Sequence, residues 1–353
     1  MADYTTIDNP AKHFNTVLYS GTGSSNSVTG VGFQPDWTWI KQRNGTTHHF
    51  IYDAVRGATN TIYTSATSAD AVQSQGLTAF GTDGFTVGTN TGVNGAGGTG
   101  GTYVAWNWLG ANGTTSNSDG SITSTVSANQ TAGFSIVTYT SNSTSSNETV
   151  GHGLGVKPDM VITKNRDSAY NWDIYHTSLG YNANLIFTNA TTRSGAFGTS
   201  EPTSTVFRTS PSFTTNSTDK YVAYCFAGKQ GYSKFGQYEG NASTDGTFVY
   251  TGFLPAFVMV KNIDATENWI IFDNKRPGYN LTDALLKPNL TNAESTSGVK
   301  FDLVSNGFKA RVSDAEGNSS NTFIYMAFAE HPFVTAGTKA AGTARLCLEK
   351  TEE

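Results

Sequence analysis

Carboxylates are the first residues to test for chemistry, and they give no catalytic pattern. Glycoside hydrolysis needs two carboxyl groups flanking one bond. The first glutamate is Glu148, so Asp36, Asp53 and Asp83 would have to serve in the first third of the chain. These aspartates lie at turns and strand ends, where a structural role is the simpler interpretation. The carboxylates therefore predict no acid–base pair.

Histidines and glycine-rich loops are the other candidates. No two histidines have the H-x-x-x-H or H-E-x-x-H spacing of zinc sites. The segment GHGLG (151–155) has no accompanying G-x-S-x-G motif. The glycine-rich segment 88–101 has no G-K-[ST] after it and precedes a strand, which indicates a surface loop and not a phosphate cradle. We expect no catalytic residue, metal site or cofactor, and hence no enzyme.

Composition predicts an all-β protein. Only 14% of the residues are charged, whereas 38 glycines, 16 tyrosines and 21 phenylalanines are present. The net charge of −5 argues against nucleic-acid binding. No apolar run approaches the roughly 18 residues of a membrane-spanning helix, and the N-terminus has no signal-peptide pattern. With only Cys225 and Cys347, folding in a reducing cytosol is the simplest expectation.

A three-fold internal repeat is the strongest pattern. The strings GFQPDWTWIKQRN (32–44), GVKPDMVITKNRD (155–167) and GFLPAFVMVKNID (252–264) share a proline and a lysine six residues apart. An aromatic residue follows each lysine after eleven positions. The nine residues that define the repeat are Pro35, Lys41, Tyr52, Pro158, Lys164, Tyr175, Pro255, Lys261 and Phe272. Such conserved spacing predicts three copies of one unit.

The copies recur about every 100 residues, which is the size of a small β-sandwich. We predict three tandem antiparallel β-sandwich repeats of jelly-roll type. The predicted divisions are a leader or docking segment (1–11), repeat 1 (12–110), a linker (111–130), repeat 2 (131–230), repeat 3 (231–333) and a C-terminal tail (334–353). The polar linker predicts a hinged first repeat, while repeats 2 and 3 pack as a rigid pair.

Two recurrent residue types have structural interpretations. The repeated lysines end strand-like runs, so we expect them to guard strand edges or to form salt bridges. Trp37 and Trp39 alternate with Thr38, which places both indoles on one face of a strand. Core packing is favoured for the tryptophans over a platform for sugar rings.

Binding residues are expected on loops at the sandwich tips, because such loops vary in length between the copies. The tip loops are 20–28, 88–101 and 140–148. The candidate receptor-binding residues are His48, His49, Asn90, Asn94, Asn142 and Asn147.

Several strings carry a resemblance to a known family. They are TTIDNPAKHFNTVLYSG (5–21), PDWTWIKQR, DAVRG, DGFTVG and YVAWNW in the first copy, GHGLGVKPDMVITKNRD in the second, and FIYMAFAEHPFV in the third. Together they resemble a family of virion proteins of marine and cyanobacterial tailed phages. The resemblance covers nearly the whole chain and implies tail-fibre-like modules of tandem β-sandwiches with no established catalytic residues. The third copy departs from the pattern at Ala256.

The resemblance implies a virion surface protein that is made in the host bacterial cytoplasm. The expected function is that of a tail-fibre or tail-appendage component, which recognises host-surface glycan without catalysis. The alternative is a structural capsid decoration protein, and a polysaccharide depolymerase would need a carboxylate pair in one cleft. Expected partners are other tail or capsid proteins, host polysaccharide and further copies of the chain, with a trimer favoured.

Overall fold

The computed structural model describes residues 4–96, 100–142, 148–188, 190–191, 193–194, 197–198, 200–208, 218–298 and 300–333. Over these residues the protein is built from antiparallel sheets, with only a 3₁₀ turn, η1 (Pro10–Lys12), and a short helix, α1 (Thr91–Asn94), besides. The predicted all-β, sandwich-like fold is confirmed. No helix in this part of the chain has the length and apolarity to cross a membrane. The predicted tail 334–353 lies outside the described residues.

Repeat 1 packs a six-stranded sheet, ordered β1-β9-β3-β4-β5-β6, against a three-stranded sheet, ordered β2-β8-β7. The strands are β1 (Phe14–Ser20), β2 (Asn26–Thr29), β3 (Trp37–Gln42), β4 (Phe50–Asp53), β5 (Asn60–Tyr63), β6 (Ala71–Val72), β7 (Leu77–Gly81), β8 (Gly84–Val87) and β9 (Thr102–Trp108). The sequence DGF (83–85) lies in the predicted hairpin, where Phe80 of β7 pairs with Phe85 of β8. Gly84 adopts a φ of +148°, which favours glycine.

Repeat 2 has a six-stranded sheet, ordered β10-β11-β12-β19-β14-β15, and two short ribbons, β13-β18 and β16-β17. Its strands are β10 (Thr115–Asn117), β11 (Ser124–Asn129), β12 (Phe134–Thr140), β13 (Thr149–Gly151), β14 (Met160–Asn165), β15 (Asp173–His176), β16 (Ala183–Asn184), β17 (Arg193–Ser194), β18 (Val206–Arg208) and β19 (Lys220–Phe226).

Repeat 3 pairs a four-stranded sheet, ordered β20-β26-β22-β23, with a three-stranded sheet, ordered β21-β25-β24. Its strands are β20 (Ser233–Glu239), β21 (Phe248–Tyr250), β22 (Phe253–Asn262), β23 (Trp269–Asp273), β24 (Phe301–Val304), β25 (Gly307–Ala310) and β26 (Thr322–Pro332). All three large sheets therefore contain the same four strands in the same order: β1-β9-β3-β4, β12-β19-β14-β15 and β20-β26-β22-β23.

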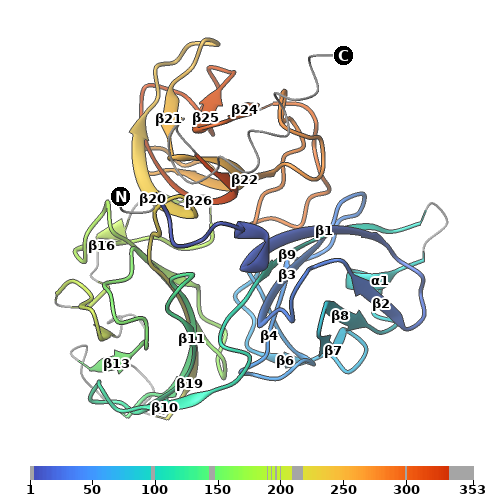
Figure 1. Cartoon of the computed structure of the whole chain (residues 1–353), viewed down its shortest axis with the longest axis vertical. Coiled ribbons are helices and arrows are strands. Elements are labelled where there is room, and N and C mark those ends of the chain that lie inside the picture. Colours follow the sequence, from blue (N-terminus) through green and yellow to red (C-terminus); the bar gives the residue numbers. More distant parts are fainter. Residues whose placement is uncertain are drawn as a thin grey trace, which may run out of the picture.

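The repeats surround a common centre. Figure 1 shows three lobes, repeat 1 in blue, repeat 2 in green and repeat 3 in orange and red, arranged as a closed ring. Each repeat has a private core between its own sheets. A fourth apolar cluster contains residues from all three large sheets. We call this cluster the shared core.

Aromatic rings fill the shared core, and each pair of repeats meets there. Trp37 of repeat 1 lies 4.7 Å from Tyr224 of repeat 2, measured between ring centroids. Trp108 of repeat 1 lies 5.7 Å from Phe257 of repeat 3. The rings of Phe226 in repeat 2 and Phe328 in repeat 3 have their centroids 6.0 Å apart. The tryptophans are core residues, as predicted, but the core that they fill lies between the repeats.

The large sheets are buried on both faces, which is unusual for antiparallel sheets. All six residues of β14 and the first five of β3 are buried. One face of each sheet packs into the private core and the other into the shared core. The three repeats consequently form one body.

Two predicted segments differ from the structure. The predicted linker, 111–130, contains β10 and β11, and β11 pairs with β12 along its whole length. The polar residues of this segment form the edge of the repeat 2 sheet, so repeat 1 is not joined to repeat 2 through a hinge. The leader is likewise integrated, because Ile7 is buried in the shared core and the Tyr4 hydroxyl donates to the carbonyl of Gly252.

Candidate functional site

Two of the three junctions between repeats share one structural feature. In repeats 2 and 3, the tryptophan that precedes or begins the fourth common strand donates a hydrogen bond from its indole to the backbone of the neighbouring repeat. Trp172 Nε1 donates to the Tyr63 carbonyl at 2.8 Å, and Trp269 Nε1 donates to the Ile186 carbonyl at 2.9 Å. His49 holds the third equivalent position. Burial lowers its pKa well below the ordinary value, and the backbone of Lys287 opposes this shift in part.

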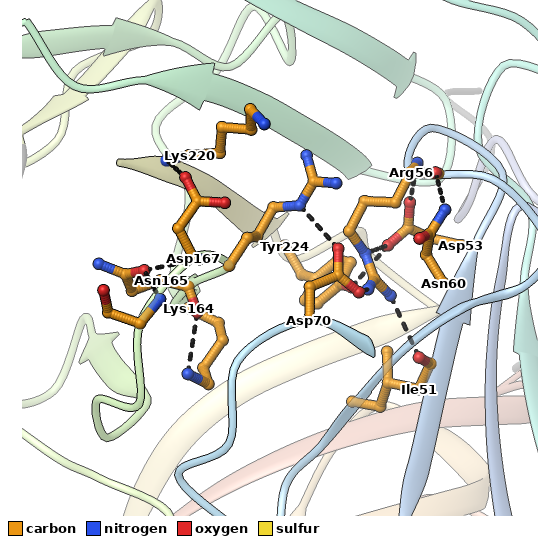
Figure 2. A network of polar contacts seen from close by, with 12 residues as sticks. Ile51, Asp53, Arg56, Asn60, Asp70, Lys164, Asn165, Asp167, Lys220 and Tyr224 are labelled. Atoms are coloured by element: carbon orange, nitrogen blue, oxygen red, sulfur yellow. Dashed lines mark hydrogen bonds and ion pairs between the residues drawn. The ribbon is translucent and has the colours of Figure 1, made fainter. Parts of the chain in front are cut away.

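The junction of repeats 1 and 2 contains a buried ion network (Figure 2). Arg56 lies between two carboxylates, with Nε 2.5 Å from Asp53 and Nη1 2.9 Å from Asp70. Arg166 of repeat 2 binds the other oxygen of Asp70 at 2.9 Å. The Tyr224 hydroxyl donates to Asp53 at 2.7 Å. Burial opposes the charge of Arg56, but Asp53, Tyr224 and Asp70 outweigh it and raise the guanidinium pKa.

The junction of repeats 3 and 1 repeats this network with different residues. Arg276 lies 2.6 Å from Asp273 and 3.0 Å from Glu294. Arg43 of repeat 1 binds Glu294 at 2.8 Å, and the Trp106 indole donates to Asp273 at 2.9 Å. Burial would raise the Glu294 pKa, but hydrogen bonds and charge from both arginines lower it. This network closes the ring between segments far apart in sequence.

The junction of repeats 2 and 3 lacks this network at the equivalent positions. His176 and Leu179 stand where the other repeats have the aspartate and arginine, and Ile263 replaces the second arginine. Leu179 and Ile263 pack on the shared core. His176 Nε2 donates to the Tyr325 carbonyl at 3.2 Å, while its Nδ1 accepts from the Ser178 amide at 3.2 Å. Burial lowers the pKa of His176 to about 4, so the ring is neutral near pH 7.

The repeated lysines are neither edge guards nor salt-bridge partners, so that prediction was wrong. Lys41, Lys164 and Lys261 are fully buried, and each donates to the carbonyl of the residue after it. Lys41 also donates to Thr291 of repeat 3 at 3.2 Å, and Lys164 donates to Thr67 of repeat 1 at 3.1 Å. Two of the lysines therefore fasten the loop of a neighbouring repeat. Burial lowers the pKa of all three to about 8.

These fastened loops enclose a pocket that we call the axial pocket. Its volume is about 270 Å³, and all three repeats line it. Its lining residues are Ser65, Ala66, Thr67, Asn171, Trp172, Phe187, Thr188, Asn268, Asn289 and Leu290. The pocket would not exist in a single repeat, since it requires the closed ring.

Within the described part of the chain, the axial pocket is lined by amides, hydroxyls and apolar groups, with no charged side chain. Its walls are held by hydrogen bonds: Asn289 donates to Asn268 at 2.9 Å and accepts from the Trp269 amide at 3.0 Å. Asn171 is exposed at the rim. Amides and hydroxyls both donate and accept hydrogen bonds, which suits a neutral polar ligand.

Two predicted site residues lie close to this pocket. His48 holds the position equivalent to Asn171 and Asn268, and its Nδ1 lies 3.0 Å from the hydroxyl of the lining residue Ser65. His49 is buried and lies beside Trp39, whose indole donates to its Nδ1 at 3.0 Å. Neither histidine itself lines the pocket. The equivalence of position 48 to two asparagines was the signal available in the sequence.

The predicted asparagines do not gather with these histidines. Asn90 caps helix α1 by accepting from the Gly92 amide at 2.8 Å. Asn94 is fully buried and donates to the Gly88 carbonyl at 2.7 Å, which makes it an internal support for the tip loop. Asn142 is exposed near the end of β12, away from the axial pocket lining. Asn147 lies outside the described residues.

The remaining polar motifs have structural roles. Asp36 accepts from the Asn112 amide at 3.0 Å, and its counterpart Asp159 accepts from the Gly228 amide at 2.7 Å. Asp83 accepts from the Gly30 and Gly32 amides, which lower its pKa. No group of three or more His, Cys, Asp or Glu side chains in the described ranges is arranged to hold a metal ion.

Comparison with known proteins identifies a family. The family described as a domain of unknown function (DUF7483) matches residues 9–332. A search of curated proteins returned no match. The matched range extends over all three repeats. The chain belongs to the DUF7483 family.

Proposed function

We propose that the protein is a virion surface component of a tailed phage, a tail-fibre or tail-appendage part that binds host-surface glycan without catalysis. The phage assignment rests on the sequence resemblance. The axial pocket is the observation that carries the binding role, because three repeats jointly build it and line it with neutral polar groups.

The chemistry of the lining favours a neutral sugar. A sugar residue presents hydroxyl groups that both donate and accept, and the lining offers amides and hydroxyls of the same capacity. Trp172, Phe187 and Leu290 add apolar surface for the carbon–hydrogen faces of a pyranose ring. The volume of about 270 Å³ is just below the range of about 300 to 1,000 Å³ that is usual for ligand sites, which suits one sugar residue of a longer chain.

The ring makes the pocket rigid. Lys41 and Lys164 each tie a pocket-forming loop to a neighbouring repeat, and the ion networks hold the same junctions. A preorganised site loses less conformational entropy when it binds. One pocket per chain gives weak affinity, so display in many copies on the virion would supply strong attachment through avidity.

The test fills the pocket and leaves the surface otherwise intact. Asn171→Trp places a large ring at the exposed rim, and Asn182→Trp is the matched control on an exposed residue outside the pocket. Purified protein is applied to an array of neutral bacterial-surface oligosaccharides, and its inhibition of phage adsorption to host cells is measured. We expect binding and inhibition by the wild type and Asn182→Trp, and loss of both by Asn171→Trp. Binding that is unchanged in Asn171→Trp, or that is absent throughout, would overturn the proposal.

A capsid decoration protein is the second candidate, and the ring geometry favours it. Three similar repeats around one centre give a single chain approximate threefold form (Figure 1). Such a chain can occupy a threefold position of a lattice without forming a trimer. Imaging of labelled virions separates the candidates: one chain per threefold capsid position supports decoration, and label confined to the tail supports attachment.

A further inference from the structure

We propose that a groove between repeats 2 and 3, distinct from the axial pocket, binds acidic saccharides. The groove has a volume of about 370 Å³. Tyr4, Asp159, Lys229, Lys234 and Tyr250 line it, together with the turns at 228–231 and 251–252. None of these residues belongs to the axial pocket, so this inference stands independently of the proposed function.

The leader is built into the groove. Tyr4 donates from its hydroxyl to the Gly252 carbonyl at 2.5 Å. Gly231 and Gly252 have φ values of +75° and +85°, and a Cβ atom at Gly252 would lie only 2.7 Å from the Tyr4 hydroxyl. A Cβ atom at Gly231 would lie 3.1 Å from the Tyr4 ring. Two left-handed glycines thus leave room for this tyrosine against the two turns.

An exposed aromatic ring forms one wall. Tyr250 ends β21 and is 49% exposed, which is high for a residue of its size in a sheet. Lys234 lies with its Nζ 5.2 Å from the centre of the Tyr250 ring and donates to the Tyr250 carbonyl at 2.7 Å. The lysine contacts the ring by a cation–π interaction and the backbone of the same residue by a hydrogen bond.

The charges in the groove favour an anion. Among the lining residues that the structure describes, Lys229 and Lys234 supply two ammonium groups, and Asp159 supplies one carboxylate. That carboxylate already accepts from the Gly228 amide at 2.7 Å through one of its oxygens. An aromatic ring stacks on the apolar face of a pyranose, and an ammonium group pairs with a carboxylate. A uronic acid combines both features, which identifies the ligand class.

The experiment uses the full chain and a defined probe. Oligogalacturonate and its fully methyl-esterified form are titrated by calorimetry at low and high salt. We expect the acid to bind about tenfold or more tightly than the ester, a difference of ~1.4 kcal/mol, and to weaken as salt increases. Tyr250→Ala and Lys229→Ala should each weaken binding of the acid by about tenfold.

Matched controls lie on the same sheet. Phe248 is 45% exposed on the same strand but does not line the groove, so Phe248→Ala should bind like the wild type. Lys309→Ala removes a positive charge from the neighbouring strand β25, also outside the groove. Asn171→Trp should leave uronate binding unchanged, which separates this site from the axial pocket.

Four results would overturn the proposal. They are equal binding of acid and ester, wild-type binding by Tyr250→Ala, an equal loss in Phe248→Ala, and no binding of oligogalacturonate at about 10 mM. Circular dichroism of each variant confirms that the fold is retained, since Tyr250 and Phe248 are both half-exposed.

Discussion

The hydroxyl of Tyr224 in repeat 2 donates a 2.7 Å hydrogen bond to the buried carboxylate of Asp53 in repeat 1. The Trp106 indole of repeat 1 makes the equivalent contact with Asp273 of repeat 3 at 2.9 Å. These two bonds connect neighbouring repeats at the same structural position. Different donors bind equivalent carboxylates in the two junctions, which shows that the junction geometry is kept while its residues change.

Removal of the Tyr224 hydroxyl should destabilise the ring. Tyr224→Phe takes away a donor from a buried carboxylate, and we expect a loss of about 1.5 to 3 kcal/mol in the free energy of unfolding. Chemical denaturation measures this loss. Tyr232→Phe is the matched control, because the Tyr232 hydroxyl is buried without a hydrogen-bond partner among the described residues. The control should be neutral or stabilising, and an equal loss in both variants would contradict the role of the Tyr224–Asp53 bond.

Disruption of the buried ion network should cost more than one hydrogen bond. Arg56→Leu leaves Asp53 buried and without its main counter-charge, so we expect a loss of about 3 to 5 kcal/mol. The double variant Asp53→His, Arg56→Leu gives repeat 1 the histidine and leucine that repeat 2 has at the equivalent positions, His176 and Leu179. This double variant should recover at least half of the stability that Arg56→Leu loses. A double variant that is less stable than Arg56→Leu alone would show that the junctions are not interchangeable.

Acid should weaken the junction of repeats 2 and 3. The His176 pKa is about 4 in the fold and roughly 6.5 in an unfolded chain, so the unfolded state binds the proton first as pH falls. Stability from this group is complete above about pH 6.5 and is lost progressively toward pH 4. Thermal unfolding from pH 7 to 4 should show a smaller drop for His176→Gln than for the wild type. His331→Gln changes an exposed histidine and should retain the wild-type drop; equal drops in all three proteins would contradict the assignment.

The buried lysines should make the fold more stable as pH rises into mild alkali. The pKa of Lys164 is about 8 in the fold and roughly 10.5 in an unfolded chain, so the unfolded state holds more protons between these values. Lys41 and Lys261 behave alike. Their contribution to stability therefore rises between pH 8 and 10. The increase in melting temperature from pH 7.5 to 9.5 should shrink in Lys164→Met but not in Lys220→Met, which changes an exposed lysine.

The sequence predicts the repeat and its strands well, because each copy contains the same turn and aromatic signals. Tyr19 pairs with Tyr103, and Tyr139 pairs with Tyr221, where opening and closing aromatic strands meet. The ring was not predicted, although one signal was present. Runs such as MVITKN (160–165) show little polar alternation, as expected for a sheet that is buried on both faces.

The candidate site was less predictable, because its residues come from loops that only the ring brings together. Asn171 and Asn268 look like ordinary turn residues in sequence. From the sequence, Lys164 is expected at the edge of a strand. Nothing in the sequence indicates that the Thr67 carbonyl of another repeat lies 3.1 Å from its ammonium group. His48 lies beside the pocket without lining it, and its residue type differs from that of its two counterparts.

The most direct test of the ring is differential scanning calorimetry combined with hydrogen exchange of the tryptophan indoles. If the three repeats share one core, the intact chain should unfold in a single two-state transition. The Trp172 and Trp269 Nε1 protons, which bridge repeats, should then exchange only through that global opening. Separate transitions for the repeats, or rapid exchange of these two indoles while the rest of the core stays protected, would contradict the account.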